Sequence, residues 1–172
     1  PTLTFPTAKN DTDSQIAVEW ALERGARRIV VAGGLGSRLD HSLANCQLLV
    51  RIARAGGAGG ITDGRQAVYL LFGTARDLGG GAGFEAEHPG PAGRLVLDAP
   101  AGHLFSVIPL GECRGLRLRG CRWELDGYDL SMGDTRTVSN EFAGRPVALS
   151  LESGVALVIT SPAERGGEAT SN

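Results

Sequence analysis

The stretch that decides the fold of this chain joins an apolar run to a glycine-rich turn. It reads Ile29-Val30-Val31-Ala32-Gly33-Gly34-Leu35-Gly36-Ser37-Arg38-Leu39-Asp40-His41. A short β-branched run bounded by glycine is typical of a buried strand, and we expect that strand over residues 27–32. The residues that follow, 40–54, have helical periodicity. A glycine-rich turn between a strand and a helix favours phosphate, because the backbone can approach an anion and the helix N-terminus offers N–H donors.

The segments around this stretch alternate between helix and strand. Residues 12–24 predict a helix, since Thr12 and Gln15 have the spacing of a capping box and Gly25 is suited to end it. Residues 61–72 predict two strands joined by an Asp63-Gly64 turn. Alternating helices and strands indicate a mostly parallel sheet.

The pattern changes after Phe72. Residues 79–83 and 88–91 are rich in glycine and proline and indicate a linker or loop. Beyond Arg94 the apolar residues recur with period two, which predicts an antiparallel sandwich. The predicted fold class is therefore α/β plus all-β: a partial Rossmann-like parallel α/β domain over 1–75, a linker over 76–93, a β-sandwich domain over 94–161, and a disordered tail over 162–172.

Composition narrows the range of functions. The 172 residues are 42% hydrophobic and carry a net charge of −2, so no basic surface argues for nucleic acid. No apolar run approaches the length needed to cross a bilayer. The three cysteines, Cys46, Cys113 and Cys121, have no metal-binding or redox spacing. We expect reduced thiols and a cytoplasmic location.

Three blocks of the sequence, in order, resemble the thiamine pyrophosphokinase family. The central one is Gly33–Asn45, the upstream one is Lys9–Asp13, and the downstream one is formed by Ser139–Phe142 with Leu151–Val155. The family has Asp where this chain has Asn10, which leaves a metal role at that position in doubt. The resemblance also implies a family segment before Pro1 that carries magnesium- and nucleotide-binding blocks, so we expect residues 1–172 alone to be inactive or nearly so.

The resemblance implies a thiamine diphosphokinase that transfers pyrophosphate from ATP to thiamine, giving thiamine diphosphate and AMP, with Mg²⁺ as cofactor. It implies a homodimer whose site lies where the α/β domain of one subunit meets the sandwich of its partner. The implied ATP- and phosphate-binding residues are Lys9, Thr12, Gly34, Gly36, Arg38 and His41. The implied catalytic residues are Asp13, Arg38 and Asp40, with Asp13 as the metal ligand. The implied thiamine-binding residues are Asp40, Ser139 and Asn140.

Most of these residues also have an ordinary structural explanation. Thr12, Asp13 and Asp40 are residue types that cap helices. Arg38 can pair with Asp40 merely to shape the loop. His41 can bond the backbone, and we expect Asn45, one helical turn later, to orient the loop.

Similar alternatives apply to the second half and to the function. Ser139 and Asn140 are favoured in simple turns. Trp123 and Phe142 can wall a ligand site or pack in the core. Two alternative functions remain open: a non-catalytic binder of thiamine or a nucleotide, and another α/β nucleotide-binding enzyme.

Overall fold

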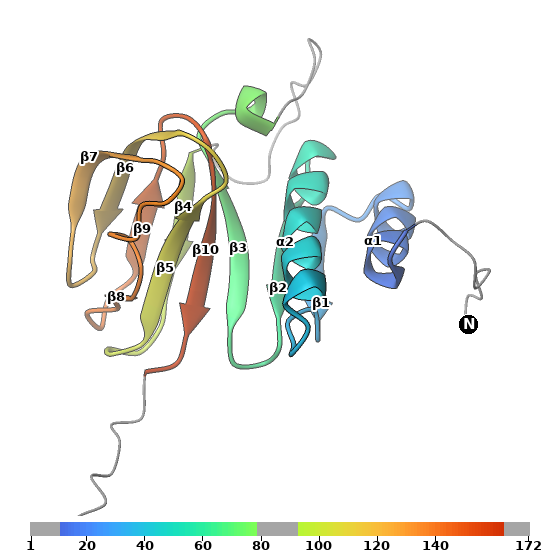
Figure 1. The fold of residues 1–172 in the computed structure, drawn as a ribbon, viewed down its shortest axis with the longest axis horizontal. Helices are drawn as coiled ribbons and strands as arrows, with labels where there is room; N and C mark the ends of the chain where they lie inside the picture. The colour runs from blue at the N-terminus through green and yellow to red at the C-terminus, as the bar shows by residue number, and fades with distance from the viewer. Residues whose placement is uncertain (1–10, 79–92, 164–172) are drawn as a thin grey trace, which may run out of the picture.

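The structure, a computed structural model, describes residues 11–78 and 93–163 (Figure 1). The elements of the first range are α1 (Asp13–Glu23), β1 (Arg28–Ala32), α2 (Leu39–Arg54), β2 (Ala58–Thr62), β3 (Ala67–Phe72) and the short 3-10 helix η1 (Ala75–Leu78). Those of the second are β4 (Arg94–Leu97), β5 (Leu104–Pro109), β6 (Cys113–Arg119), β7 (Leu125–Leu130), β8 (Asn140–Glu141), β9 (Val147–Ser150) and β10 (Val155–Ser161). No helix in these two ranges is long and apolar enough to cross a membrane.

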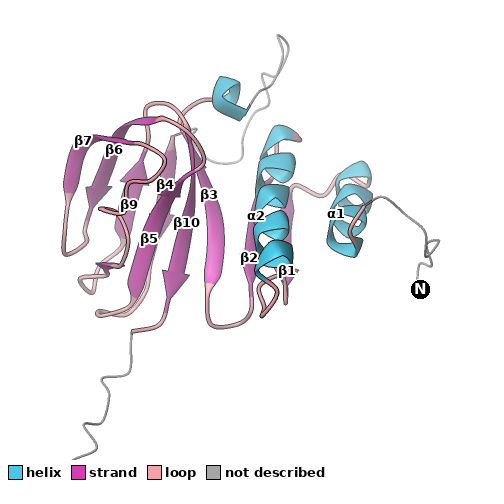
Figure 2. Ribbon diagram, viewed as in Figure 1, coloured by secondary structure: helices cyan, strands magenta, loops and turns pink. Residues whose placement is uncertain are grey.

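The strands form two sheets. The larger has six strands in the order β1-β2-β3-β10-β5-β8, and the smaller has four in the order β4-β9-β6-β7. Figure 2 shows both α-helices beside β1 and β2, and strands alone around β5, β6, β7 and β9. The predicted fold class, an α/β part followed by an antiparallel sandwich, is confirmed.

Fewer strands of the sheet pair in parallel than the sequence predicts. Within the described strands only β1 and β2 pair in parallel, and β3 returns antiparallel to β2 through the turn at residues 63–66. β3 then pairs with β10 along its whole length, from Ala67 opposite Thr160 to Phe72 opposite Val155. One sheet therefore runs through both parts of the chain.

Local sequence explains where α1 begins and ends. The Thr12 hydroxyl accepts a hydrogen bond from the Gln15 backbone N–H at 3.2 Å, as predicted. The Gln15 side chain donates to Asp11 at 2.7 Å instead of returning to Thr12, so the capping box is only half formed. Gly25 follows the helix with a φ of 83°, a backbone conformation that glycine adopts without strain.

The expectation of a buried strand at residues 27–32 is wrong in one respect. β1 is an outer strand of the described sheet, and its residues alternate between half-buried and exposed. Ile29 and Val31 pack toward the helices, whereas Val30 on the other face is 72% exposed. The β-branched run predicted the strand correctly, but not which faces have neighbours.

Two hydrophobic cores lie on opposite faces of the six-stranded sheet. The first packs α1 and α2 on the sheet and includes Val18, Leu49, Ile52, Ile61, Val68 and Leu157. The second fills the space between the two sheets and includes Phe105, Val107, Leu116, Leu118, Leu149, Ala156 and Val158. Alternate residues of β10 therefore serve both cores, as the two-residue period of a strand requires.

All three cysteines are free and buried. Burial raises the pKa of the Cys46, Cys113 and Cys121 thiols. Their thiolate forms are therefore scarce at neutral pH, and a packing role fits them better than a nucleophilic one.

Gly73 holds the end of β3 against the loop before β10. Its N–H donates to the Gly154 carbonyl at 3.0 Å. A Cβ on Gly73 would lie 2.4 Å from Ser153 Cα and 2.5 Å from the Glu152 carbonyl oxygen. Both obstructing atoms belong to the backbone, so neither can swing away.

We predict that Gly73→Ala destabilises the fold by overpacking this junction. The expected drop in melting temperature is about 2–10 °C. Gly111→Ala is the matched control, because no atom lies within 4 Å of its Cβ position. Thermal unfolding of both variants measures the effect, and equal melting temperatures would contradict the predicted clash.

Candidate functional site

The loop of residues 33–38 lies at the carboxyl end of the parallel pair, between β1 and α2. Ligands of open α/β sheets bind outside the carboxyl ends of such strands. Arg38 is the N-cap residue of α2, and its side chain makes no capping hydrogen bond. Apart from the His41 N–H, which faces the Asp40 carboxylate, the first-turn N–H groups of α2 are therefore suited to an anion.

Side chains of α2 hold this loop in place. The Asn45 amide donates to the buried Gly34 carbonyl at 2.8 Å, which confirms the orienting role predicted for Asn45. The Ser42 hydroxyl accepts from the Gly36 N–H at 3.1 Å and lies 3.1 Å from the Arg38 carbonyl, to which it can donate. Hydrogen bonds from α2 therefore hold the loop near both of its ends.

The two predicted phosphate-binding glycines differ in what requires them. A Cβ on Gly34 would lie 2.6 Å from Ile61 Cγ2 and 3.1 Å from Val31 Cγ1, so packing alone demands glycine there. A Cβ on Gly36 would meet no atom within 4 Å. Packing within the protein therefore explains why residue 34 is glycine, but it does not explain why residue 36 is glycine.

Arg38 and Asp40 form the ion pair that the sequence left as one alternative. Arg38 Nη2 lies 2.7 Å from Asp40 Oδ2, and Nε lies 3.3 Å from Oδ1. Their side chains are 68% and 66% exposed, so the pair adds little to stability. The Arg38 guanidinium, followed by the His41 backbone N–H, lowers the pKa of Asp40. A carboxylate with a lowered pKa is a weaker general base, which favours an orienting role for Asp40 over proton abstraction.

The other predicted residues of this half are placed as follows. The His41 side chain is exposed, and Thr12 caps α1. Asp13 is exposed in the first turn of α1 and lines a groove of about 750 Å³ between α1 and β1, together with Trp20 and Val31. Lys9 and Asn10 lie outside the described residues.

Asp13 as a metal ligand stays a prediction. Within residues 11–78 and 93–163, no three or more His, Cys, Asp and Glu side chains gather into a group that could hold a metal ion. A magnesium site of the kind completed by substrate phosphates needs only one or two protein carboxylates. Asp13 fits that kind of site, whereas an all-protein cage is excluded for the described residues.

A second cavity, of about 610 Å³, surrounds Ser139 and Asn140. Ser139 has a φ of 59°, which is unusual for a residue other than glycine and often marks a functional turn. Its N–H donates to the Ser106 hydroxyl at 3.0 Å. The other residues lining the cavity are Leu118, Arg122, Trp123, Glu124, Leu125, Arg136, Thr137 and Val138.

The structure separates the two aromatic residues considered for this region. Phe142 is buried and packs edge-on against Phe105, with 5.3 Å between ring centroids. Trp123 lines the cavity and is 54% exposed. Sequence reasoning did not single out Arg136, which also lines the cavity. Its place three residues before Ser139 is the only sequence signal that could have found it.

The loop and the second cavity are not brought together within one chain. β1 and β8 are opposite edges of the six-stranded sheet, with four strands between them. At about 4.8 Å per strand, the two edges are on the order of 24 Å apart. Figure 1 shows the same separation, with β1 and α2 toward one end of the molecule and β7 and β8 toward the other.

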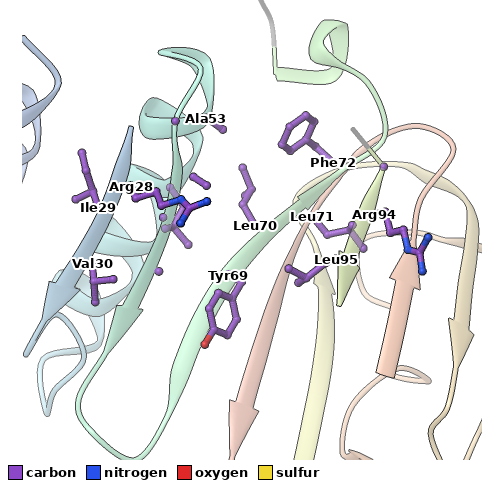
Figure 3. Close-up of a pocket in the computed structure, with 16 residues that line it drawn as sticks. Arg28, Ile29, Val30, Ala53, Tyr69, Leu70, Leu71, Phe72, Arg94 and Leu95 are labelled. Atoms are coloured by element: carbon purple, nitrogen blue, oxygen red, sulfur yellow. The ribbon is translucent and has the colours of Figure 1, made fainter. Parts of the chain in front are cut away.

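A third cavity, of about 360 Å³, contains none of the predicted site residues. Figure 3 shows its lining, which comes from β1, β3, α2 and the start of β4 as well as from glycines of β2. Apolar groups such as Val30, Tyr69 and Leu71 dominate it, with Arg28 and Arg94 as the charged members. It has no cluster of polar groups suited to catalysis.

Comparison with known proteins identifies the family. Residues 1–57 match the catalytic domain of thiamin pyrophosphokinase, and residues 95–156 match its vitamin B1 binding domain. The chain belongs to the thiamine pyrophosphokinase family. The two matches fall in sequence order on the α/β part and the sandwich.

A curated relative agrees with the family assignment and is longer than this chain. Thiamine pyrophosphokinase of Bacillus subtilis (strain 168) is 24% identical over 159 residues, which cover 91% of this chain and 65% of the relative. The chain therefore spans somewhat less than two thirds of that curated relative.

Solved structures share the fold. Thiamine pyrophosphokinase from Bacillus subtilis has a TM-score of 0.73 at 24% identity and covers 92% of this chain and 66% of its own. The enzyme of that name from Geobacillus thermodenitrificans has a TM-score of 0.71 at 24% identity, with coverages of 95% and 66%. A thiamin pyrophosphokinase family protein from Enterococcus faecalis has a TM-score of 0.72 at 24% identity, with coverages of 94% and 68%.

We predict that Asn45→Ala destabilises the chain by about 1–3 kcal/mol, because the buried Gly34 carbonyl loses its donor. Gln47→Ala, at an exposed position of the same helix, is the control. Urea unfolding measures both. A midpoint for Asn45→Ala as high as that of the control would show that this hydrogen bond does not hold the loop.

Proposed function

We propose that the full-length protein transfers a pyrophosphoryl group from ATP to thiamine, giving thiamine diphosphate and AMP, and that this chain contributes its phosphate-binding loop and its thiamine cavity. The observation that carries the proposal is the ordered match of both family domains to the two parts of the fold. The composition and position of the loop at the carboxyl end of β1 support the same chemistry. Phosphoryl transfer of this kind depends on positioning and on charge neutralisation rather than on a covalent enzyme intermediate.

The 33–38 loop and the start of α2 would receive the triphosphate. Arg38 presents a planar fork of donors that suits phosphate oxygens, and its partner Asp40 keeps the guanidinium in place until ATP arrives. Gly36 leaves open space beside the loop. Lys9, Thr12 and His41 are proposed as further contacts to ATP, with Lys9 acting as a point charge.

Magnesium would be held mainly by ATP, with Asp13 as the protein carboxylate. An exposed carboxylate in the first turn of a helix suits this role, since Mg²⁺ keeps several waters and takes few protein ligands. Bound there, the ion would neutralise charge on the phosphates. Asp13 would do no more than fix its position.

Thiamine would bind in the cavity around Ser139. Because that cavity and the 33–38 loop lie near opposite edges of one sheet, a complete site requires the loop of one subunit and the cavity of another. We therefore propose a homodimer with the site at the subunit interface. Asp40 would contact thiamine from the loop side. The free cysteines fit the cytoplasmic location that we propose for the reaction.

The proposal is tested by supplying the chain with ATP, thiamine and Mg²⁺ and quantifying AMP and thiamine diphosphate by chromatography. Calorimetric titration with thiamine runs in parallel. Thiamine-dependent AMP supports the proposal. Thiamine binding without AMP is the expected result for residues 1–172 alone, whereas the same result for the full-length protein would favour a non-catalytic thiamine-binding protein. The absence of both from the full-length protein would overturn the assignment.

We predict that, in the full-length protein, Arg38→Ala lowers kcat for AMP formation by about ten- to a hundredfold, because a charge-assisted phosphate contact is lost. Its melting temperature should change by no more than about 2 °C, since the exposed Arg38–Asp40 pair contributes little to stability. Arg38→Lys should recover part of the rate, as it keeps the charge but not the fork.

Arg24→Ala is the control for this variant. Arg24 is an exposed arginine at the C-terminal end of α1, where its guanidinium lies over the Trp20 ring. Its kcat should equal that of the unmodified chain. A large fall in melting temperature with an unchanged rate for Arg38→Ala would make Arg38 a structural residue.

A further inference from the structure

Several polar side chains around Ser139 are already bonded to the protein itself. Asn140 is only 5% exposed, and its amide is bonded to both the N–H and the carbonyl of Trp123, at 3.2 and 2.7 Å. The buried Thr137 hydroxyl donates to the Val107 carbonyl at 2.6 Å. The Asn140 amide therefore faces the protein interior, whereas the sequence predicts that it contacts thiamine.

Three charged side chains are found among the described residues that line this cavity, and two of them form ion pairs. Arg122 pairs with Glu141, with 2.8 Å between Nη1 and Oε2. Glu124 pairs with Arg145, with 3.5 Å between Oε1 and Nη2. The third charge in the lining is that of Arg136.

Arg136 is held in the lining without an ion-pair partner. Its guanidinium carbon lies 5.0 Å from the centre of the Tyr128 ring. Asp134 is two residues away, but its carboxylate accepts from the Tyr128 hydroxyl and, at 2.9 Å, from the Arg136 backbone N–H. Within residues 11–78 and 93–163, no carboxylate lies at ion-pair distance from the Arg136 guanidinium. The side chain is exposed, so N–H donors of its fork remain available to an anion.

The charge of the ligand changes during the proposed reaction. Thiamine carries a permanent positive charge on its thiazolium ring, which an arginine does not attract. The thiamine hydroxyl oxygen bonds to the β-phosphorus of ATP, and the bond from that phosphorus to the oxygen shared with the α-phosphorus breaks. That oxygen leaves with AMP, and the hydroxyl proton passes to water. The product therefore carries a diphosphate anion that the substrate lacks.

We propose that Arg136 binds the diphosphate group as it forms on thiamine, while the 33–38 loop of the partner subunit holds that group from the other side. This inference rests on the proposed function. Because the contact is stronger for the diphosphate than for thiamine, it favours the transferred group over the bound substrate. Tyr128 and Asp134 are positioning residues, since they hold the guanidinium and the backbone of Arg136.

Titration of the full-length protein with thiamine and with thiamine diphosphate tests the proposal. Calorimetry should show that Arg136→Ala raises Kd for thiamine diphosphate about ten- to a hundredfold, as expected for a lost charge-assisted contact. Kd for thiamine should rise by less than about twofold, since no attraction to the thiazolium is lost. Arg136→Lys keeps the charge but not the fork, and its Kd for thiamine diphosphate should be intermediate.

Arg114→Ala is the matched control. Arg114 is another exposed arginine of the sandwich, paired with Asp129 and outside the cavity lining. Its Kd for both ligands should equal that of the unmodified protein. Added salt should weaken thiamine diphosphate binding to the unmodified protein more than to Arg136→Ala, because salt screens an exposed charge contact.

A double-mutant cycle tests the positioning role of Tyr128. Tyr128→Phe keeps the ring and removes the hydroxyl that bonds Asp134. It should raise Kd for thiamine diphosphate when Arg136 is present, and should add little when residue 136 is already alanine. In turnover, thiamine diphosphate should inhibit competitively with thiamine, and its inhibition constant for Arg136→Ala should rise by the same factor as its Kd.

The outcomes distinguish this inference from the proposed function. An unchanged Kd for thiamine diphosphate in Arg136→Ala would overturn the inference and leave the proposed function standing. Equal losses of affinity for thiamine and thiamine diphosphate would also overturn it, because they would make Arg136 a structural residue. Additive effects in the cycle would overturn the positioning role of Tyr128. No binding of either ligand to the unmodified full-length protein would overturn the proposed function and this inference with it.

Discussion

The pairing of β10 with β3 on one side and β5 on the other is the constraint on which the rest of the structure depends. It joins the helix-covered strands to the sandwich in a single sheet, and it places alternate β10 side chains in both hydrophobic cores. Because strand spacing in a sheet is nearly invariant, the same pairing sets the separation between the 33–38 loop and the cavity around Ser139 and Asn140. The proposed site at a subunit interface follows from this geometry rather than from any feature of the loop itself.

Local signals predicted the elements well. Thr12 and Gly25 marked the ends of α1, and the Asp63-Gly64 turn marked the β2–β3 hairpin, because caps and turns are decided within a few residues. The β3–β10 pairing could not be predicted in this way. Thr160 bonds to Ala67 across 93 residues, and hydrophobic periodicity carries no information about which distant strands become neighbours. The exposure of Val30 escaped prediction for the same reason.

In the candidate site, too, contacts between residues close in sequence could be predicted and contacts between distant residues could not. The Arg38–Asp40 pair was one of the alternatives that the sequence left open, and the Asn45 bond to the loop was predicted, since Asp40 lies two residues from Arg38 and Asn45 lies on the helix that directly follows the loop. The inward direction of the Asn140 side chain was not predicted. A Ser-Asn pair has the same appearance in sequence whether its amide faces a ligand or the protein. Only the hydrogen bonds between the Asn140 amide and the backbone of Trp123, 17 residues away, distinguish the two.

The position of β10 in the chain also has a consequence for biosynthesis. It is the last strand of the described structure, yet both cores remain incomplete until it is in place. A ribosome makes a chain from its N-terminal side toward its C-terminal side, so α2, β3 and the first sandwich strands emerge before the strand that covers their apolar faces. Long-range pairings of this kind form slowly and leave apolar surface exposed meanwhile. The nascent chain therefore completes its fold late, and the apolar faces of α2 and β3 stay uncovered until β10 has been made.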